Sequence, residues 1–130
     1  LIVFGEWPED LTLIDEPLKK KKSDTGEKEA FVAKDGKKAL SEFYLIKKNK
    51  GLSHLKVKII TGRMHQIRAH TKFKGFPIVG DKKYGEESLN KRLRGEGLNR
   101  MLLHATSINF NNLDIECSID PPKIFSKIIA

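Results

Sequence analysis

The chain has 130 residues, of which 38% are hydrophobic and 32% charged, and its formal net charge at pH 7 is +8. This length fits one domain with a hydrophobic core. No apolar run exceeds four residues, so we expect neither a membrane-spanning helix nor a signal peptide. A single cysteine, Cys117, excludes an internal disulfide and is typical of a reducing compartment, which predicts a cytoplasmic protein.

Short extended segments dominate the first half of the chain. Strands are predicted where β-branched and aromatic residues gather or where apolar and polar residues alternate, namely at 1–4, 11–14, 31–33, 39–47 and 55–59. The last two of these surround a turn at 49–51, which indicates an antiparallel hairpin with one solvated face. Residues 15–29 have almost no apolar side chains and are predicted to form a solvated loop.

The second half begins with a change of period. Met64, Ile67 and Thr71 share one side of a helix that Gly75 is expected to end. Helix formers at 85–100 are mixed with three glycines, which predicts a mobile excursion. Two further strands, with a turn at Asn111-Asn112, are expected at 101–119, and a short helix after Pro121-Pro122. The whole pattern predicts an α+β fold, a mixed, mainly antiparallel sheet with a few short helices.

Positive charge is concentrated in the middle of the chain. The segment from Lys47 to Tyr84 holds eleven Lys or Arg and one acid, Asp81, so its net charge is +10. Residues 1–46 sum to −2 and residues 85–130 to zero. Such a concentration of cations in one segment is the pattern expected of a protein that binds a polyanion.

Within this segment, polar and basic residues cluster at a predicted strand-to-helix junction. Five of them fall within eight positions after the Thr61-Gly62 break: Arg63, His65, Gln66, Arg68 and His70. Free backbone N–H groups and the helix dipole favour an anion at such a junction, and Arg is suited to a phosphate or a carboxylate. The cluster therefore predicts a site for a phosphate or for a carboxylate that the protein itself supplies.

The segment 75–85, G-F-P-I-V-G-D-K-K-Y-G, has two interpretations. In the structural one, its glycines permit tight turns and Asp81 accepts hydrogen bonds from backbone amides. In the functional one, Lys82 and Lys83 contact phosphates and the ring of Tyr84 stacks on a base.

The sequence predicts neither a metal site nor a cysteine nucleophile. His65 and His70 are five residues apart, about 140° around a helix, so they cannot share one face as zinc ligands do. No cysteine cluster accompanies them, and no metal site is expected. Cys117 lies between apolar residues in an alternating pattern, where a packed thiol is expected rather than a nucleophile.

The motifs resemble those of RluA-type pseudouridine synthases. Residues 61–70, T-G-R-M-H-Q-I-R-A-H, are similar to the family's T-G-R-x-H-Q-I/L-R-x-H, and 75–85 to its G-x-P-I-x-G-D-x-x-Y-G. Residues 36–41 resemble G-K-x-A/S-x-T with Ser41 in place of Thr, and 102–105 contain L-H-A. The order and spacing agree over nearly the whole chain.

The resemblance implies that residues 1–130 are the C-terminal portion of a pseudouridine synthase catalytic domain. The family's nucleophilic Asp, in an H/G-R-L-D motif, is absent here and is expected on a segment before Leu1. By the same resemblance, Arg63 is the catalytic partner that keeps this Asp ionised. The missing Asp would also explain why the cationic cluster contains no acid. This fragment alone is expected to be inactive.

The family isomerises uridine in RNA to pseudouridine without a cofactor or metal. We therefore expect no cofactor, no metal and no membrane, with ribosomal or transfer RNA as the partner of a monomer. The residues expected to contact RNA are His65, Gln66, Arg68, His70, Lys82, Lys83 and Tyr84. Two alternatives stay open: a non-catalytic RNA-binding module with the same fold, and a structural protein with a lysine-rich surface.

Overall fold

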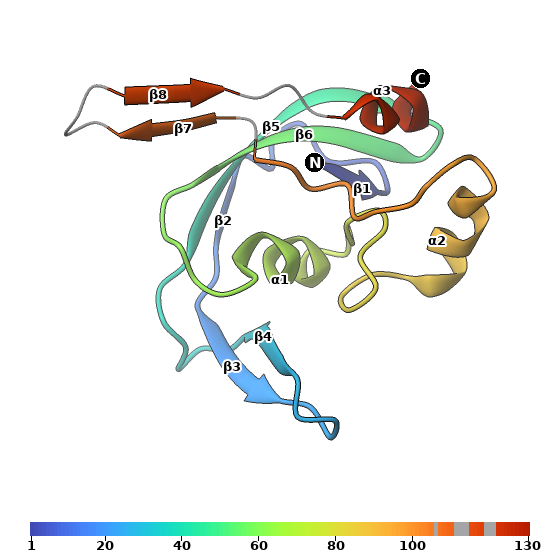
Figure 1. The fold of residues 1–130 in the computed structure, drawn as a ribbon. Coiled ribbons are helices and arrows are strands. Elements are labelled where there is room, and N and C mark those ends of the chain that lie inside the picture. Colours follow the sequence, from blue (N-terminus) through green and yellow to red (C-terminus); the bar gives the residue numbers. More distant parts are fainter. Residues whose placement is uncertain (106, 111–114, 119–121) are drawn as a thin grey trace.

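A four-stranded antiparallel sheet forms the centre of the molecule (Figure 1). The computed structural model describes residues 1–105, 107–110, 115–118 and 122–130. The strand order is β1–β6–β5–β2. These strands are Ile2–Phe4 (β1), Leu40–Asn49 (β5), Leu52–Ile59 (β6) and Leu13–Asp15 (β2).

Two smaller hairpins and three short helices complete the fold. Leu18–Lys22 (β3) pairs with Lys28–Val32 (β4), and Ser107–Phe110 (β7) pairs with Ile115–Ser118 (β8), both antiparallel. The helices are Gln66–Phe73 (α1), Glu87–Arg94 (α2) and Lys123–Ile129 (α3). The predicted α+β class, mainly antiparallel with few short helices, is confirmed.

The predicted hairpin at 39–59 is formed by β5 and β6. Lys50 and Gly51 connect the strands with positive φ angles of 56° and 74°, as a two-residue type I′ turn requires. The ladder runs from Ser41 opposite Ile59 to Asn49 opposite Leu52, with a register shift between Leu45 and Lys47. Alternation then buries Ser41 and Phe43 on one face of the sheet and exposes Tyr44 on the other.

Both faces of the sheet are covered near β1. Val3 packs on one face in a cluster that includes Ile67 of α1, and Ile2 packs on the other with residues of α2 and α3. The first cluster consists of Leu1, Val3, Trp7, Ile14, Phe43, Leu55, Ile67 and Ile78. The second consists of Ile2, Phe4, Leu52, Val79, Leu93, Leu98, Leu102, Phe125, Ile128 and Ile129. The sheet therefore fixes α1 and α2 relative to each other through opposite sides of one strand.

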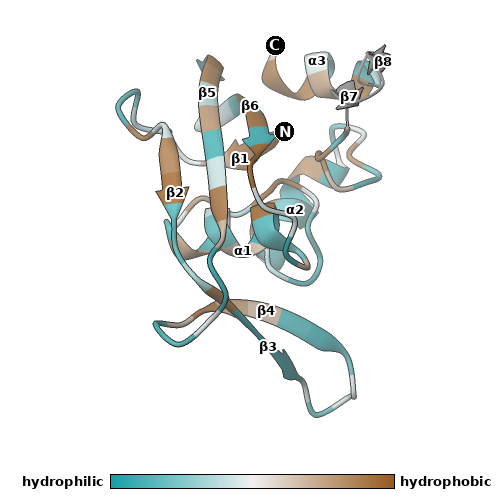
Figure 2. Ribbon diagram, turned by 90° about the vertical axis from the view of Figure 1, so that its left-hand side faces the viewer, coloured by the Kyte–Doolittle hydropathy of each residue, from teal (hydrophilic) through white to brown (hydrophobic). Residues whose placement is uncertain are grey.

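Two sequence-based expectations were wrong. Residues 15–29 are not a loop, because β3 lies within them and pairs with β4. Leu18 is 5% exposed and anchors this hairpin against Ala69 of α1 and Tyr84, although the rest of β3 is lysine and strongly hydrophilic (Figure 2). Residues 85–100 contain the helix α2, which Leu93 anchors in the core. The predicted turn at 111–112 lies outside the described residues.

None of the helices in the described residues is long and apolar enough to cross a membrane.

Candidate functional site

Gln66, the first residue of α1, holds the junction between β6 and this helix. Its Oε1 accepts hydrogen bonds from the Thr61 hydroxyl at 2.7 Å and from the Arg63 backbone N–H at 3.1 Å. Its Nε2 donates to the Leu40 carbonyl at 2.7 Å and to the Ser41 hydroxyl at 2.9 Å. Gln66 is 3% exposed, and all four of its side-chain hydrogen bonds are to groups of the chain itself.

His70 continues this network on the buried side of α1. Its Nε2 lies 2.9 Å from the Glu16 carbonyl, which can only accept, so Nε2 carries the proton and donates. Its Nδ1 then accepts from the Ser41 hydroxyl at 3.0 Å. Burial lowers the pKa of His70, more than the Glu16 carbonyl raises it. His70 is 0% exposed and neutral, and it links the helix to the segment before β3 rather than reaching the surface.

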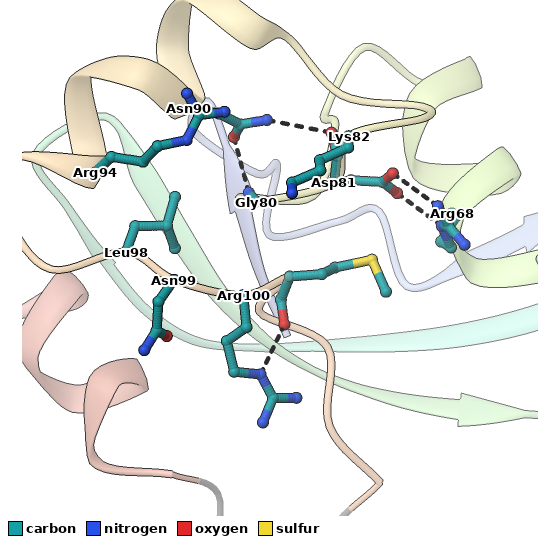
Figure 3. Close-up of a pocket in the computed structure, with 10 residues that line it drawn as sticks. Arg68, Gly80, Asp81, Lys82, Asn90, Arg94, Leu98, Asn99 and Arg100 are labelled. Atoms are coloured by element: carbon teal, nitrogen blue, oxygen red, sulfur yellow. Dashed lines mark hydrogen bonds and ion pairs between the residues drawn. The ribbon is translucent and has the colours of Figure 1, made fainter.

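Arg68 and Asp81 form a bidentate ion pair (Figure 3). Arg68 Nε lies 2.8 Å from Asp81 Oδ2, and Nη2 lies 2.9 Å from Oδ1. Oδ1 also accepts from the backbone N–H groups of Lys83 and Tyr84 at 3.0 Å each, which confirms Asp81 as an acceptor within its turn. Burial raises the pKa of Asp81, but Arg68 and these N–H groups together hold it below its usual value. One arginine of the cationic cluster, Arg68, thus has an acid partner within the chain, which the sequence did not predict.

Tyr84 joins α1 to the β3–β4 hairpin. Its hydroxyl accepts from the Ala30 backbone N–H at 2.8 Å and lies 2.9 Å from His65 Nδ1. The Arg68 guanidinium carbon sits 4.8 Å from the centre of its ring, at cation–π distance. Burial, together with the charges of Arg68 and Lys83, lowers the pKa of His65. Tyr84 is 4% exposed, so the structure favours the structural interpretation of this ring over stacking on a base.

Arg63 lies differently. Its side chain is exposed, and its Nε donates to the Lys38 carbonyl at 2.9 Å. Among the described residues, no carboxylate forms an ion pair with Arg63 and no other acceptor binds its guanidinium. Two residues later, His65 adopts a left-handed backbone, φ 52°, and directs the chain into α1. The junction therefore presents one guanidinium whose two Nη groups are available to a partner outside the described chain.

The two lysines of the Gly80–Gly85 turn are not equivalent. Lys83 donates to the Lys28 carbonyl at 2.6 Å and lies 3.4 Å from the Glu27 carboxylate, so it is committed to the β3–β4 hairpin. Lys82 is exposed, and its amine has no bonding partner within the described part of the chain. Within the same residues, no group of three or more His, Cys, Asp or Glu side chains could hold a metal ion.

Sequence reasoning missed two residues that hold the site. Ser41 is 0% exposed and joins Gln66 to His70; its place in the G-K-x-A-x-S pattern was the available signal. Asn90 is 1% exposed, accepts from the Gly80 N–H at 2.8 Å and donates to the Asp81 carbonyl at 3.1 Å. It lies in α2, in a stretch whose glycines and charges gave no such signal.

Comparisons with known proteins identify relatives of this chain. Ribosomal large subunit pseudouridine synthase C of Haemophilus ducreyi is 37% identical over 111 residues, which are 85% of this chain and 35% of that protein. The protein of the same name from Escherichia coli strain K12 is 33% identical over 113 residues, with the same coverage. The chain thus spans about 35% of the length of the curated relatives it matches.

A solved structure and a family profile also match this chain. The structure of human RNA pseudouridylate synthase domain containing 1 superposes with a TM-score of 0.76 at 24% identity, covering 97% of this chain and 54% of that one, and this likeness shows the fold. The profile of the RNA pseudouridylate synthase family matches residues 2–73, more than half of the chain. The chain therefore belongs to the RNA pseudouridylate synthase family.

Proposed function

We propose that the chain is the C-terminal portion of the catalytic domain of an RNA pseudouridine synthase. The whole protein, in this proposal, is a cytoplasmic enzyme that converts uridine to pseudouridine in ribosomal RNA, the substrate class in the names of its curated relatives. The observation that carries the proposal is Arg63: in a chain of this family, its guanidinium stands exposed at the β6–α1 junction without a carboxylate among the described residues. The N-terminal portion supplies that carboxylate.

In this proposal, the reaction requires an ionised carboxylate and no second substrate. The bond between uracil N1 and ribose C1′ breaks, the base turns, and a bond between C5 and C1′ forms, while C5 loses a proton and N1 gains one. Atoms and electrons balance without an oxidant, a reductant or a second substrate. The target base must leave its stack for this to happen. A guanidinium within about 4–6 Å of a carboxylate keeps it ionised in a poorly solvated site, and this is the role we propose for Arg63.

The remaining residues of the two motifs divide by exposure. Gln66, His70 and Tyr84 are buried, and we propose that they position the junction and the hairpin. His65, Arg68, Lys82 and Lys83 keep part of their side chains at the surface, and we retain them as RNA contacts. RNA binding then depends on several dispersed cations, whereas turnover depends on Arg63.

Single-turnover kinetics of the full-length protein test this division. Tritium release from RNA labelled at uridine C5 reports turnover, and filter binding reports RNA affinity. Arg63→Ala removes the cation, and Arg63→Lys removes the planar fork that pairs with a carboxylate. Both variants should lower the rate at saturating enzyme by at least ~10²-fold, about 2.7 kcal/mol, with a modest loss of affinity. Arg92→Ala, an exposed arginine on α2, is the matched control and should keep the rate.

Two outcomes contradict the proposal. If Arg63→Ala weakens binding but keeps the saturated rate, Arg63 is an ordinary phosphate contact. If the wild-type full-length protein binds RNA and releases no tritium from any ribosomal RNA, the protein is a non-catalytic RNA-binding module.

A further inference from the structure

A basic pocket of about 460 Å³ lies between α2 and the turn at Gly80–Lys82 (Figure 3). Four cationic side chains line it: Arg68, Lys82, Arg94 and Arg100. The one acid among the lining residues is Asp81, and both of its oxygens are bonded to Arg68, with Oδ1 also bonded to backbone N–H groups. The pocket therefore carries an excess of positive charge that its own acid does not offset.

The wall formed by the turn is rigid. Gly80 has a φ of +83°, and a Cβ there would come within 2.2 Å of the Arg100 carbonyl oxygen, so only glycine permits this approach. The buried Asn90 side chain bonds to both Gly80 and Asp81. This wall of the pocket is thus fixed by close backbone packing and buried hydrogen bonds.

Three of the cations remain available to a ligand. Lys82 has no side-chain partner among the residues that the structure describes. Arg94 pairs with Glu87, but their side chains are 42% and 63% exposed, and such surface pairs contribute little stability. Arg100 donates to the main-chain carbonyls of Met101 and Leu103 and lies 5.6 Å from the centre of the Phe125 ring, and none of these partners carries a negative charge. Two arginines and a lysine around one cavity favour an anion with several acceptor oxygens.

We propose that this pocket binds one backbone phosphate of the RNA substrate, separately from Arg63. The inference rests on the proposed function, because it assigns the pocket to the same RNA. A phosphate suits it better than a base does, since the lining cations offer several N–H donors to phosphate oxygens and no aromatic ring lines the cavity. Phosphate contacts position the nucleic acid without reading its sequence. The pocket therefore sets the position of the RNA relative to the junction, while Arg63 serves the chemistry.

Binding of the full-length protein to a ribosomal RNA fragment, measured across a salt series, tests the pocket. Lys82→Gln and Arg94→Gln should each weaken binding about tenfold and reduce the slope of log K against log salt by about 0.7–0.9. Arg92→Gln is the matched control, because Arg92 lies two residues from Arg94 on α2 and does not line the pocket. It should leave affinity and slope close to the wild-type values.

Neutral methylphosphonate links placed one at a time identify the phosphate. One position should weaken binding by wild-type protein and have no further effect on Lys82→Gln. Pocket variants that bind as the Arg92→Gln control does would overturn the proposal. So would a Lys82→Gln variant that loses affinity for inorganic phosphate alone and keeps its affinity for RNA. If the methylphosphonate pattern appears but the wild-type protein releases no tritium, the pocket stands and the proposed enzyme activity fails.

Discussion

Arg63 and Arg68 stand five residues apart in one motif, yet the structure treats them in opposite ways. Arg68 is held by two hydrogen bonds to Asp81 and by the ring of Tyr84, and 19% of its side chain is exposed. Arg63 is exposed and bonds only to a main-chain carbonyl. The return of the chain at Gly80 brings an acid to Arg68, and none of the described segments brings one to Arg63.

This contrast shows that a basic cluster in a sequence is not one uniform binding surface. Arg68 is bonded to an acid of the fold, and Arg63 is left available to an external partner. The buried polar residues Gln66, Ser41 and His70 belong with Arg68, because each has its partners inside the chain. The following variants of the full-length protein test the contrast, from the largest expected effect to the smallest.

Arg68→Ala should cost about 3 kcal/mol or more in the free energy of unfolding, because it leaves the fully buried carboxylate of Asp81 without its cation. Arg63→Ala should change it by no more than about 0.5 kcal/mol, as surface substitutions do. Urea denaturation measures both. The double variant Arg68→Ala with Asp81→Asn should recover part of the loss, since no buried charge remains. Equal costs for the two arginine variants would erase the distinction between them.

Ser41→Ala should cost about 1–3 kcal/mol, because it leaves one N–H of the Gln66 amide and the His70 Nδ1 each without a buried partner. Ser41→Thr keeps the hydroxyl and is the matched control, with a smaller effect expected. Thermal unfolding of the three proteins compares them. An alanine variant as stable as wild type would mean that this buried network contributes nothing to the junction.

The smallest expected effect is a loss of stability below about pH 6.5, the ordinary histidine pKa. Burial lowers the folded-state pKa of His70, and those of His54 and His65 are lowered too, so the unfolded chain takes up protons first as the pH falls. Stability is therefore full above pH 6.5 and declines toward the folded-state pKa values. Around His70, the Asp15 and Glu16 charges oppose the shift and Lys74 adds to it.

Unfolding midpoints measured between pH 7.5 and 5 should fall for wild type and fall less steeply for His70→Gln. Asp81 does not contribute to the change in stability between pH 7.5 and 5, because its lowered pKa affects stability only near and below its ordinary value of 3.8. Identical slopes for the two proteins would show that His70 does not contribute to the acid sensitivity.

Local patterns were enough to predict much of this fold. The alternation in 39–59 and the Lys50-Gly51 turn specified the main hairpin. The spacing of Ile67 and Thr71 indicated α1, although Met64 lies before its first residue, Gln66. Patterns failed where tertiary contacts decide. Leu18 is the one apolar residue in β3, and this lysine-rich segment is a strand because it pairs with β4 and because Leu18 packs in a cluster with Ala69 of α1 and Tyr84.

The same limit applies to the site. Residue types and motif order located Arg63 at the junction and Asp81 in its turn. They could not show that Asp81 pairs with Arg68, because that contact depends on how the chain returns from Gly75 to Gly80. Nor could they separate Lys82 from Lys83, whose different surroundings come from the β3–β4 hairpin. The chemical types of the site residues could be predicted from the sequence, whereas the exposure of their side chains could not.

The place of β1 in the sheet has a consequence for assembly during synthesis. This strand pairs with residues 52–54 on one side, while Ile2 bonds to Val79 and Leu102 on the other. The ribosome thus makes β1 before residues 52–54, Val79 and Leu102, and the entropy of closing such long loops is lost before these contacts form. Ile2 and Val3, both 0% exposed in the folded state, lack part of their covering until residue 102 has been synthesised. Within the four-stranded sheet, the first strand to be synthesised is thus the last whose partners are complete.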